Sequence, residues 1–343
     1  MTEESADESG EAFIRRHFRG QARACRELGS PFTADLLDLC AETLDRGTMV
    51  GAAVLDWPGR AVEDALALRL AGGLHALVID GRDDRLRAAY EDRVDAALLQ
   101  HVFEKHEEFL LEFLSRPPQT NEVARAGVLV GGFLTVAAES GLPLSLFEIG
   151  ASAGLNLNWN SFAYELGGAT WGDPDSPLRL APQWTGPPPP AARVTVASRA
   201  GCDRDPVDPM DPADRLRLRA YIWPDQADRR RRMDAALEIM ARDPIAVERA
   251  AAADWLARQV DGLGGDSVGV LYHSIMWQYV DPAEQARIRE ILAAVERPLA
   301  WLRMEPAEDL KCAELRLTLF PGGGERLLAH ADFHGRWVEW FGG

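Results

Sequence analysis

A strand, a glycine-containing turn and the expected start of a helix follow one another in the middle of the chain. The run 144–149 is apolar and of strand length, the turn 150–154 reads G-A-S-A-G, and 155–158, L-N-L-N, can open a helix. Glycine lets a backbone approach a ligand, and N–H groups at a helix start attract polar groups. We therefore expect the amides after Ile149 to be open to a small nucleotide-like ligand. The expected contacts lie in and beside the turn: Glu148, Gly150, Ala151, Ser152, Gly154 and Asn156.

Two known motifs overlap in this turn. With Glu148 included it reads E-I-G-A-S-A-G, which resembles the first motif of Rossmann-like methyltransferases that use S-adenosylmethionine, an acidic residue followed by x-G-x-G-x-G. Ser152 stands where that motif has its middle glycine. The same residues spell G-x-S-x-G, the nucleophile elbow of α/β-hydrolases. A turn that binds nothing is the third interpretation.

Acidic residues follow the second expected strand, which we place at 193–197. Asp203, Asp205 and Asp208 come next along the chain. A carboxylate after the second strand of a nucleotide-binding sheet commonly accepts hydrogen bonds from ribose hydroxyls. Asp203 heads this set, the other two stay open as alternatives, and Glu165 is an outside candidate.

Catalytic candidates come at the ends of two later strands. The apolar run 267–272 delivers His273 and Ser274 to its C-terminal end, and a strand at 299–304 ends at Glu305. Ligands of open parallel sheets bind beyond the carboxyl ends of the strands. Either His273 or Glu305 could serve as a general base, although a lone histidine is often structural. The acceptor pocket is expected to be shaped by Trp277, Tyr279 and His334.

Asp254 and Trp255 lie in or at the start of a further helix. At this position in methyltransferases, an acidic residue beside an aromatic one contacts adenine; a place in the core is an equally open interpretation for Trp255. A serine hydrolase would instead combine Ser152 with Asp254 or Glu305, and with His330 or His334. A non-enzymatic module is the last alternative, with the Ser152 side chain filling the crevice.

The periodicity of the chain predicts an all-α N-terminal region at 1–140 and an α/β domain at 141–343. Expected helices lie at about 13–28, 32–44, 61–79, 84–114 and 121–140. The α/β domain is predicted to be a doubly wound, mostly parallel sheet that ends in an antiparallel hairpin, as in methyltransferases. The segment rich in Gly, Pro and Trp at about 167–192 reads as an inserted loop. The helical region could cap the crevice through polar side chains: His75, Asn121 or Glu122.

Composition excludes several classes of protein. The 343 residues include 37 Lys+Arg and 54 Asp+Glu, a formal net charge of −17, with 47% hydrophobic residues. This balance is typical of a soluble globular protein, and its acidity disfavours unspecific nucleic-acid binding. We expect no membrane span and no signal peptide, and hence a cytoplasmic protein. The four cysteines are widely spaced, and no metal-ligand motif occurs, so we predict no metal site.

Several strings in the chain resemble one bacterial family, catalogued as domain of unknown function 2332. They are S-P-F at 30–32, L-R-L-A-G-G-L-H at 68–75, T-N-E-V-A-R at 120–125, L-F-E-I-G-A-S-A-G-L-N-L at 146–157, Y-I-W-P-D-Q at 221–226, Y-H-S-I-M-W-Q-Y at 272–279, P-L-A-W-L-R-M-E-P at 298–306 and H-G-R-W-V-E-W at 334–340. The resemblance covers nearly the whole chain but implies no established activity. With the turn, it leads us to expect a protein that binds S-adenosylmethionine or a related nucleotide-like ligand and transfers a methyl group to a small-molecule acceptor.

Overall fold

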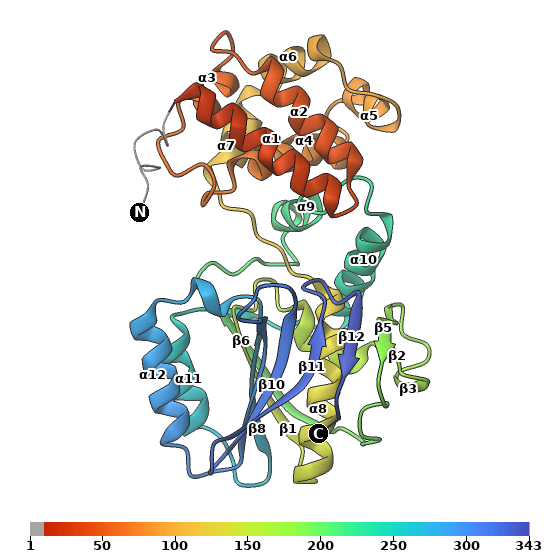
Figure 1. Cartoon of the computed structure of the whole chain (residues 1–343), viewed down its shortest axis with the longest axis vertical. Helices are drawn as coiled ribbons and strands as arrows, with labels where there is room; N and C mark the ends of the chain where they lie inside the picture. The colour runs from red at the N-terminus through yellow and green to blue at the C-terminus, as the bar shows by residue number, and fades with distance from the viewer. Residues whose placement is uncertain (1–9, 343) are drawn as a thin grey trace. The chain divides into compact units, whose positions relative to one another are not determined.

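The computed structural model describes residues 10–342, which divide into two compact units (Figure 1). One unit comprises 10–120 together with 211–230, and the other comprises 121–210 together with 231–342. The acidic segment 1–9, on which the expectation about a signal peptide rests, lies outside the described residues. The division differs from the sequence-based boundary at 140, because the last helix of the expected N-terminal region packs on the sheet of the second unit.

The first unit is helical, as its apolar periodicity predicts. Its helices are α1 (Glu11–Glu27), α2 (Pro31–Thr43), α3 (Met49–Leu55), α4 (Leu66–Ile79), α5 (Asp84–Glu91), α6 (Ala96–Lys105), α7 (Glu107–Ser115) and α9 (Pro212–Ala220), and α10 (Ala227–Arg242) begins in it. The helix expected at 61–79 begins only at Leu66, and the long helix expected at 84–114 is wrong. The side chain of Asp95 accepts a hydrogen bond from Leu98 N, so it starts a new helix where a continuous one was expected.

Segment 211–230 is held to the other helices of this unit by polar contacts. The carboxylate of Asp225 accepts hydrogen bonds from Ser30 Oγ and from Phe32 N at the start of α2, the latter at 3.1 Å. The imidazole of His75 on α4 lies 3.0 Å from Ala220 O through its Nδ1. Helix α4 therefore carries a structural histidine at position 75.

The second unit is built on one large, mixed sheet with the strand order β5-β12-β11-β10-β9-β8-β1-β6-β7. Strands β7, β6, β1, β8 and β9 are mutually parallel, and β9 to β12 form antiparallel pairs. The prediction of a mostly parallel sheet with antiparallel strands at its C-terminal end is confirmed. The strands are β1 (Leu144–Ile149), β5 (Gln183–Thr185), β6 (Val196–Asp203), β7 (Val247–Arg249), β8 (Val268–Ser274), β9 (Leu299–Pro306), β10 (Ala313–Phe320), β11 (Gly324–Ala331) and β12 (Trp337–Trp340).

The order of the parallel strands reverses between β1 and β8. Counted along the chain, β7, β6, β1, β8 and β9 give the order 3-2-1-4-5. In open parallel sheets the crevice at such a reversal, beyond the carboxyl ends of the strands, is the usual ligand site. The chain leaves these two strands at Ile149 and Ser274.

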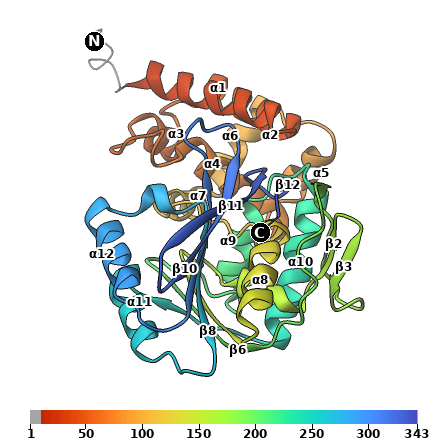
Figure 2. The same ribbon diagram turned by 60° about the horizontal axis from the view of Figure 1, so that its bottom comes forward.

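Helices cover both faces of this sheet. Helices α11 (Ala252–Asp261) and α12 (Pro282–Ala293) lie on one face and α8 (Ala126–Ser140) on the other, as Figure 2 shows. Gly132 brings α8 close to the sheet, since a Cβ at this residue would lie 2.3 Å from Leu302 Cδ1. Within residues 10–342, Val123–Ser140 is the one helical segment long and apolar enough to cross a membrane, and 78% of it is buried, which is typical of a core helix.

The segment expected to be an inserted loop at 167–192 contains strands instead. β2 (Ala163–Leu166), β3 (Ala169–Gly172) and β4 (Arg179–Leu180) form a small separate sheet, and β5 adds to the edge of the large one beside β12. These strands are too short to give an alternating sequence pattern. The expected strand at 193–197 actually begins at Val196 and extends to Asp203, which places that carboxylate at the end of the strand.

Candidate active site at the sheet edge

The C-terminal ends of the central strands bring most of the predicted site residues to one edge of the sheet. Asp203 and Ser274 are the last residues of β6 and β8. Glu148 and Glu305 are the last but one residues of β1 and β9. These strands are parallel, so their ends lie at the same edge. The convergence that the sequence predicts therefore holds for this group.

The turn after β1 has an unusual backbone. Gly150 and Gly154 have φ values of 66° and 70°, and Ser152 between them has a φ of 54°, which side-chain-bearing residues rarely adopt. The chain then continues as a short 3-10 helix, η2 (Leu155–Ser161). The helix expected to open at Leu155 is therefore present, as a 3-10 helix.

The amides of this turn are used within the protein. Hydrogen bonds link Ala151 N to Cys202 O (3.0 Å), Ser152 N to Asp203 Oδ2 (2.8 Å), Gly154 N to Ala151 O (2.7 Å) and Leu155 N to Asn121 Oδ1 (2.9 Å). The expectation that amides after Ile149 lie open to a ligand is wrong for these residues. The partners on Asp203 and Asn121 come from distant parts of the sequence, and no local pattern indicates them.

Glu148 is a buried carboxyl group in the middle of the unit. Its exposed fraction is 3%, and Tyr272 on β8 donates a hydrogen bond from its hydroxyl to Glu148 Oε2 at 3.3 Å. Burial raises the pKa of Glu148 to about 8, and the nearby charge of Asp203 acts in the same direction. The carboxyl group is consequently protonated at neutral pH.

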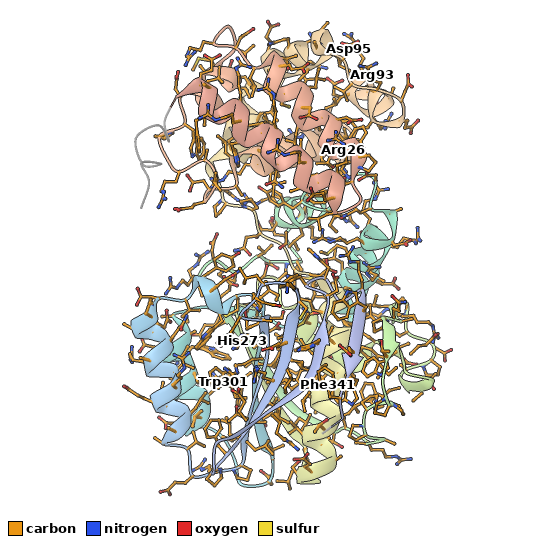
Figure 3. All side chains as sticks on the ribbon, in the orientation of Figure 1. Arg26, Arg93, Asp95, His273, Trp301 and Phe341 are labelled. Carbon is orange, nitrogen blue, oxygen red and sulfur yellow. The ribbon has the colours of Figure 1, made fainter. Side chains whose placement is uncertain are left out.

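His273 is fully buried, and both of its ring nitrogens have hydrogen-bond partners. Figure 3 labels His273 and Trp301 on the unit that contains the sheet. Nδ1 lies 2.6 Å from Glu305 Oε1, and Trp301 donates its indole N–H to Nε2 at 3.1 Å. Because Nε2 accepts, Nδ1 carries the proton and donates to Glu305. The ring also stacks on Trp277, with 5.1 Å between centroids. His273 therefore has no free nitrogen for a general base and instead holds Glu305 in place.

Glu305 has one oxygen engaged and one unpaired. Oε1 accepts hydrogen bonds from His273 Nδ1 and, at 3.1 Å, from Met276 N. Oε2 is buried and has no hydrogen-bond partner among residues 10–342. A buried carboxylate oxygen without a donor is costly, and a catalytic role is one explanation for such an atom. Of the two predicted catalytic residues, the structure favours Glu305.

The segment after β8 covers the glycine turn. Ile275 has a φ of 50°, and Ile275 N donates to Met304 O at 2.8 Å. A Cβ placed on Gly150 would lie 2.9 Å from both Met276 Cγ and Met276 Cε. The Met276 side chain thus occupies the space directly over Gly150.

A family model with the description "Uncharacterized protein conserved in bacteria (DUF2332)" matches residues 15–340. The chain belongs to this family. The resemblance inferred from the sequence strings is thereby confirmed. Comparison with curated proteins and with solved structures gave no match.

In this DUF2332 protein, the predicted pocket residues His334 and Tyr279 lie near the C-terminal end of β8. Arg125 donates hydrogen bonds to Ser274 O at 3.1 Å and to Phe333 O at 2.9 Å, which brings the turn carrying His334 towards the end of β8. Tyr279 is 75% exposed and is the last residue of the 3-10 turn η3 (Trp277–Tyr279).

Polar residues upstream of α8 support the glycine turn. Asn156 donates from Nδ2 to Glu122 O at 3.3 Å, and the side chain of Asn121 holds the amide of Leu155. Asn121 and Glu122, which the sequence suggested as contacts from a helical cap, belong to the unit that contains the sheet. They stabilise the turn from within this unit.

Two further predicted contacts, Asp254 and Trp255, lie on α11 and are engaged with partners other than the glycine turn. The carboxylate of Asp254 forms an exposed ion pair with Arg287 at 2.7 Å, and Trp255 is buried in the core against Phe147. His330 lies on β11. Strands β10, β9 and β8 stand between β11 and β1, so the distance between these two strands is about 19 Å at about 4.8 Å per strand. His330 is therefore not close to the turn that contains Ser152.

Sequence reasoning missed Ile275, Met276 and Trp301 as members of the site. All three lie within the strings quoted for the family, at 272–279 and 298–306, so the strings were the available signal. No group of three or more metal-binding side chains is present in the part of the chain that the structure describes.

Replacing His273 by Phe is expected to lower the free energy of unfolding by about 2–4 kcal/mol, because Trp301 Nε1 and Glu305 Oε1 lose a buried partner. His273→Asn, which retains a donor near the Nδ1 position, should lose less. Urea unfolding of the wild type and both variants measures this. Equal losses in the two variants would show that these hydrogen bonds do not set the stability.

Proposed function

We propose that this DUF2332 protein binds S-adenosylmethionine, or a related nucleoside ligand, at the edge formed by β1, β6 and β8, and transfers its methyl group to a small-molecule acceptor. The observation that carries the proposal is the reversal of strand order between β1 and β8, with carboxyl groups near the ends of three of the four neighbouring parallel strands: Glu148 on β1, Asp203 on β6 and Glu305 on β9.

The strand order supports assigning the sheet to the doubly wound, Rossmann-like class. The parallel strands follow the order 3-2-1-4-5, helices cover both faces, and the antiparallel strands β10 and β11 extend the sheet beyond β9. This arrangement agrees with the methyltransferase-like interpretation of the E-I-G-A-S-A-G motif. Fold likeness alone does not establish an activity, so the choice of ligand depends on the side chains of the site.

The chemistry of the edge favours a ligand with hydroxyl and cationic groups over one with phosphates. Phosphate sites use open backbone amides and basic side chains, whereas the amides of Ser152 and Leu155 are occupied here. Carboxyl groups of Asp203 and Glu305 lie at the strand ends instead. S-adenosylmethionine matches this set, because it carries ribose hydroxyls, an ammonium group and a sulfonium and no phosphate.

Asp203 is the residue best placed to bind a ribose. Its Oδ2 accepts from Ser152 N at 2.8 Å and its Oδ1 from Asp205 N at 2.9 Å. These bonds fix the orientation of the carboxylate, and each oxygen can accept another hydrogen bond. A pair of ribose hydroxyls can therefore donate to a preoriented group.

Glu305 is the proposed general base. When bound, S-adenosylmethionine supplies a methyl group activated by its positively charged sulfur. Glu305 Oε2 would accept the proton that an oxygen or nitrogen nucleophile of the acceptor loses. His273 acts as a positioning residue, since it holds Oε1 through Nδ1 and is itself fixed by Trp301. The Oε2 atom itself is buried, which limits its contact with bulk water.

Calorimetry with S-adenosylmethionine and S-adenosylhomocysteine tests the proposal. The wild type is expected to bind both, and Asp203→Asn should weaken binding by about tenfold or more, because a charged acceptor for the ribose is lost. Asp84→Asn is the matched control, since Asp84 forms an exposed ion pair with Arg87 in the helical unit. Absence of binding to the wild type at millimolar ligand would contradict the proposal and favour a non-enzymatic module.

A further inference from the structure

The link between β8 and η3 holds a strained residue at the edge of the sheet. Ile275 is β-branched and has a φ of 50°, a conformation that is unfavourable for such a side chain. Hydrogen bonds from Ile275 N to Met304 O and from Met276 N to Glu305 Oε1 keep it there. Strain of this kind persists where the surroundings enforce it and is frequent at switch regions.

The same link covers two groups that the proposed reaction needs. The Met276 side chain occupies the space over Gly150. Its Cβ, Cγ and Cε atoms lie within 3.1 Å of the position that a Cβ on Gly150 would take. The backbone of Met276 binds the engaged oxygen of Glu305, and the other oxygen of that carboxyl group is buried and unpaired. A ligand that approaches Gly150 must displace a flexible methionine side chain rather than backbone.

We propose that residues 274–276 form a gate over the glycine turn, with Met276 as the plug and Ile275 as the hinge. In the closed state, Met276 covers Gly150 and its amide is bound to Glu305. Opening relaxes Ile275 to a negative φ, uncovers Gly150 and makes Glu305 accessible. The identity of the ligand that this gate admits rests on the proposed function, because the gate controls access to that same site.

The gate predicts opposite effects for two substitutions. Ile275→Gly removes the strain of the closed state, so the closed state gains population and the affinity for S-adenosylhomocysteine should fall about five- to tenfold. Ile275→Asn, which keeps a side chain and tolerates a positive φ, should act in the same direction. Met276→Ala removes the plug, and the affinity should rise several-fold.

Matched controls lie elsewhere in the chain. Leu310 also has a positive φ, 56°, and Met210 is 49% exposed. Leu310→Gly and Met210→Ala should leave the affinity unchanged. If Ile275→Gly, Met276→Ala and both controls bind S-adenosylhomocysteine with the dissociation constant of the wild type, the gate is overturned and the proposed function still stands.

Hydrogen exchange of the ligand-free protein tests the gate independently of any ligand. The amides of Ile275 and Met276 are hydrogen-bonded only in the closed state, so their exchange reports opening. Exchange at both amides should slow several-fold in Ile275→Gly and accelerate in Met276→Ala, with Leu310→Gly matching the wild type. Unchanged exchange in both gate variants would overturn the gate. If the exchange rates change as expected but calorimetry detects no binding of the ligand, the gate is supported and the proposed ligand is rejected.

Discussion

Replacing Glu148 by Gln is expected to make the protein more stable than the wild type at pH 8 and above, by several kcal/mol. The wild-type carboxyl group has a pKa raised to about 8 by burial, whereas the same group titrates near 4.5 in the unfolded chain. Between these values the unfolded state loses a proton that the folded state keeps, so the free energy of unfolding falls as the pH rises. Integrated over this interval, the loss is roughly 5 kcal/mol.

The measurement is the free energy of unfolding in urea at a series of pH values from 5 to 9. In Glu148→Gln, the part of the pH dependence of the free energy of unfolding that is due to this group should disappear. The amide oxygen of the variant can still accept the hydrogen bond from Tyr272. The variant should be somewhat less stable than the wild type at pH 5, because the new amide N–H groups need partners. Glu165→Gln is the control, since Glu165 is exposed on β2 and should leave the slope intact. Parallel curves for Glu148→Gln and the wild type would contradict a buried, protonated Glu148.

Replacing Trp159 by Ala is expected to lower the free energy of unfolding by about 3–5 kcal/mol. Trp159 is fully buried in η2, directly after the glycine turn, and stacks on Phe133 of α8 with 4.3 Å between ring centroids. On its other side lies Trp171 of β3 at 5.3 Å. Truncation therefore leaves a cavity between α8, the turn and the small sheet.

Trp159→Phe separates this packing effect from hydrogen bonding. The indole Nε1 of Trp159 is buried without a partner among the described residues, so Phe removes an unsatisfied donor while it retains an aromatic ring. We expect this variant to lose less than about 1.5 kcal/mol in urea unfolding. If Trp159→Phe loses as much as Trp159→Ala, the stacking between Phe133 and Trp171 does not account for the stability.

Local sequence patterns determined several elements of this protein. Apolar residues at helical spacing placed α1 and α2 within about two residues of their observed bounds. Alternation on both sides of P-G-G-G placed the β10–β11 hairpin, and a short apolar run placed β1 before its glycine turn. These signals work because side-chain periodicity and turn-forming residues act within a few positions of one another.

The tertiary structure alone decided which groups of the site are available. The amide of Ser152 is bound by a carboxylate 51 residues away and the amide of Leu155 by an amide oxygen 34 residues away. Both nitrogens of His273 are occupied by partners on β9, so the sequence could name His273 and Glu305 but could not assign their roles. Hydrogen-bond partners of this kind meet only when strands pair and helices pack, and no periodicity within the chain encodes them.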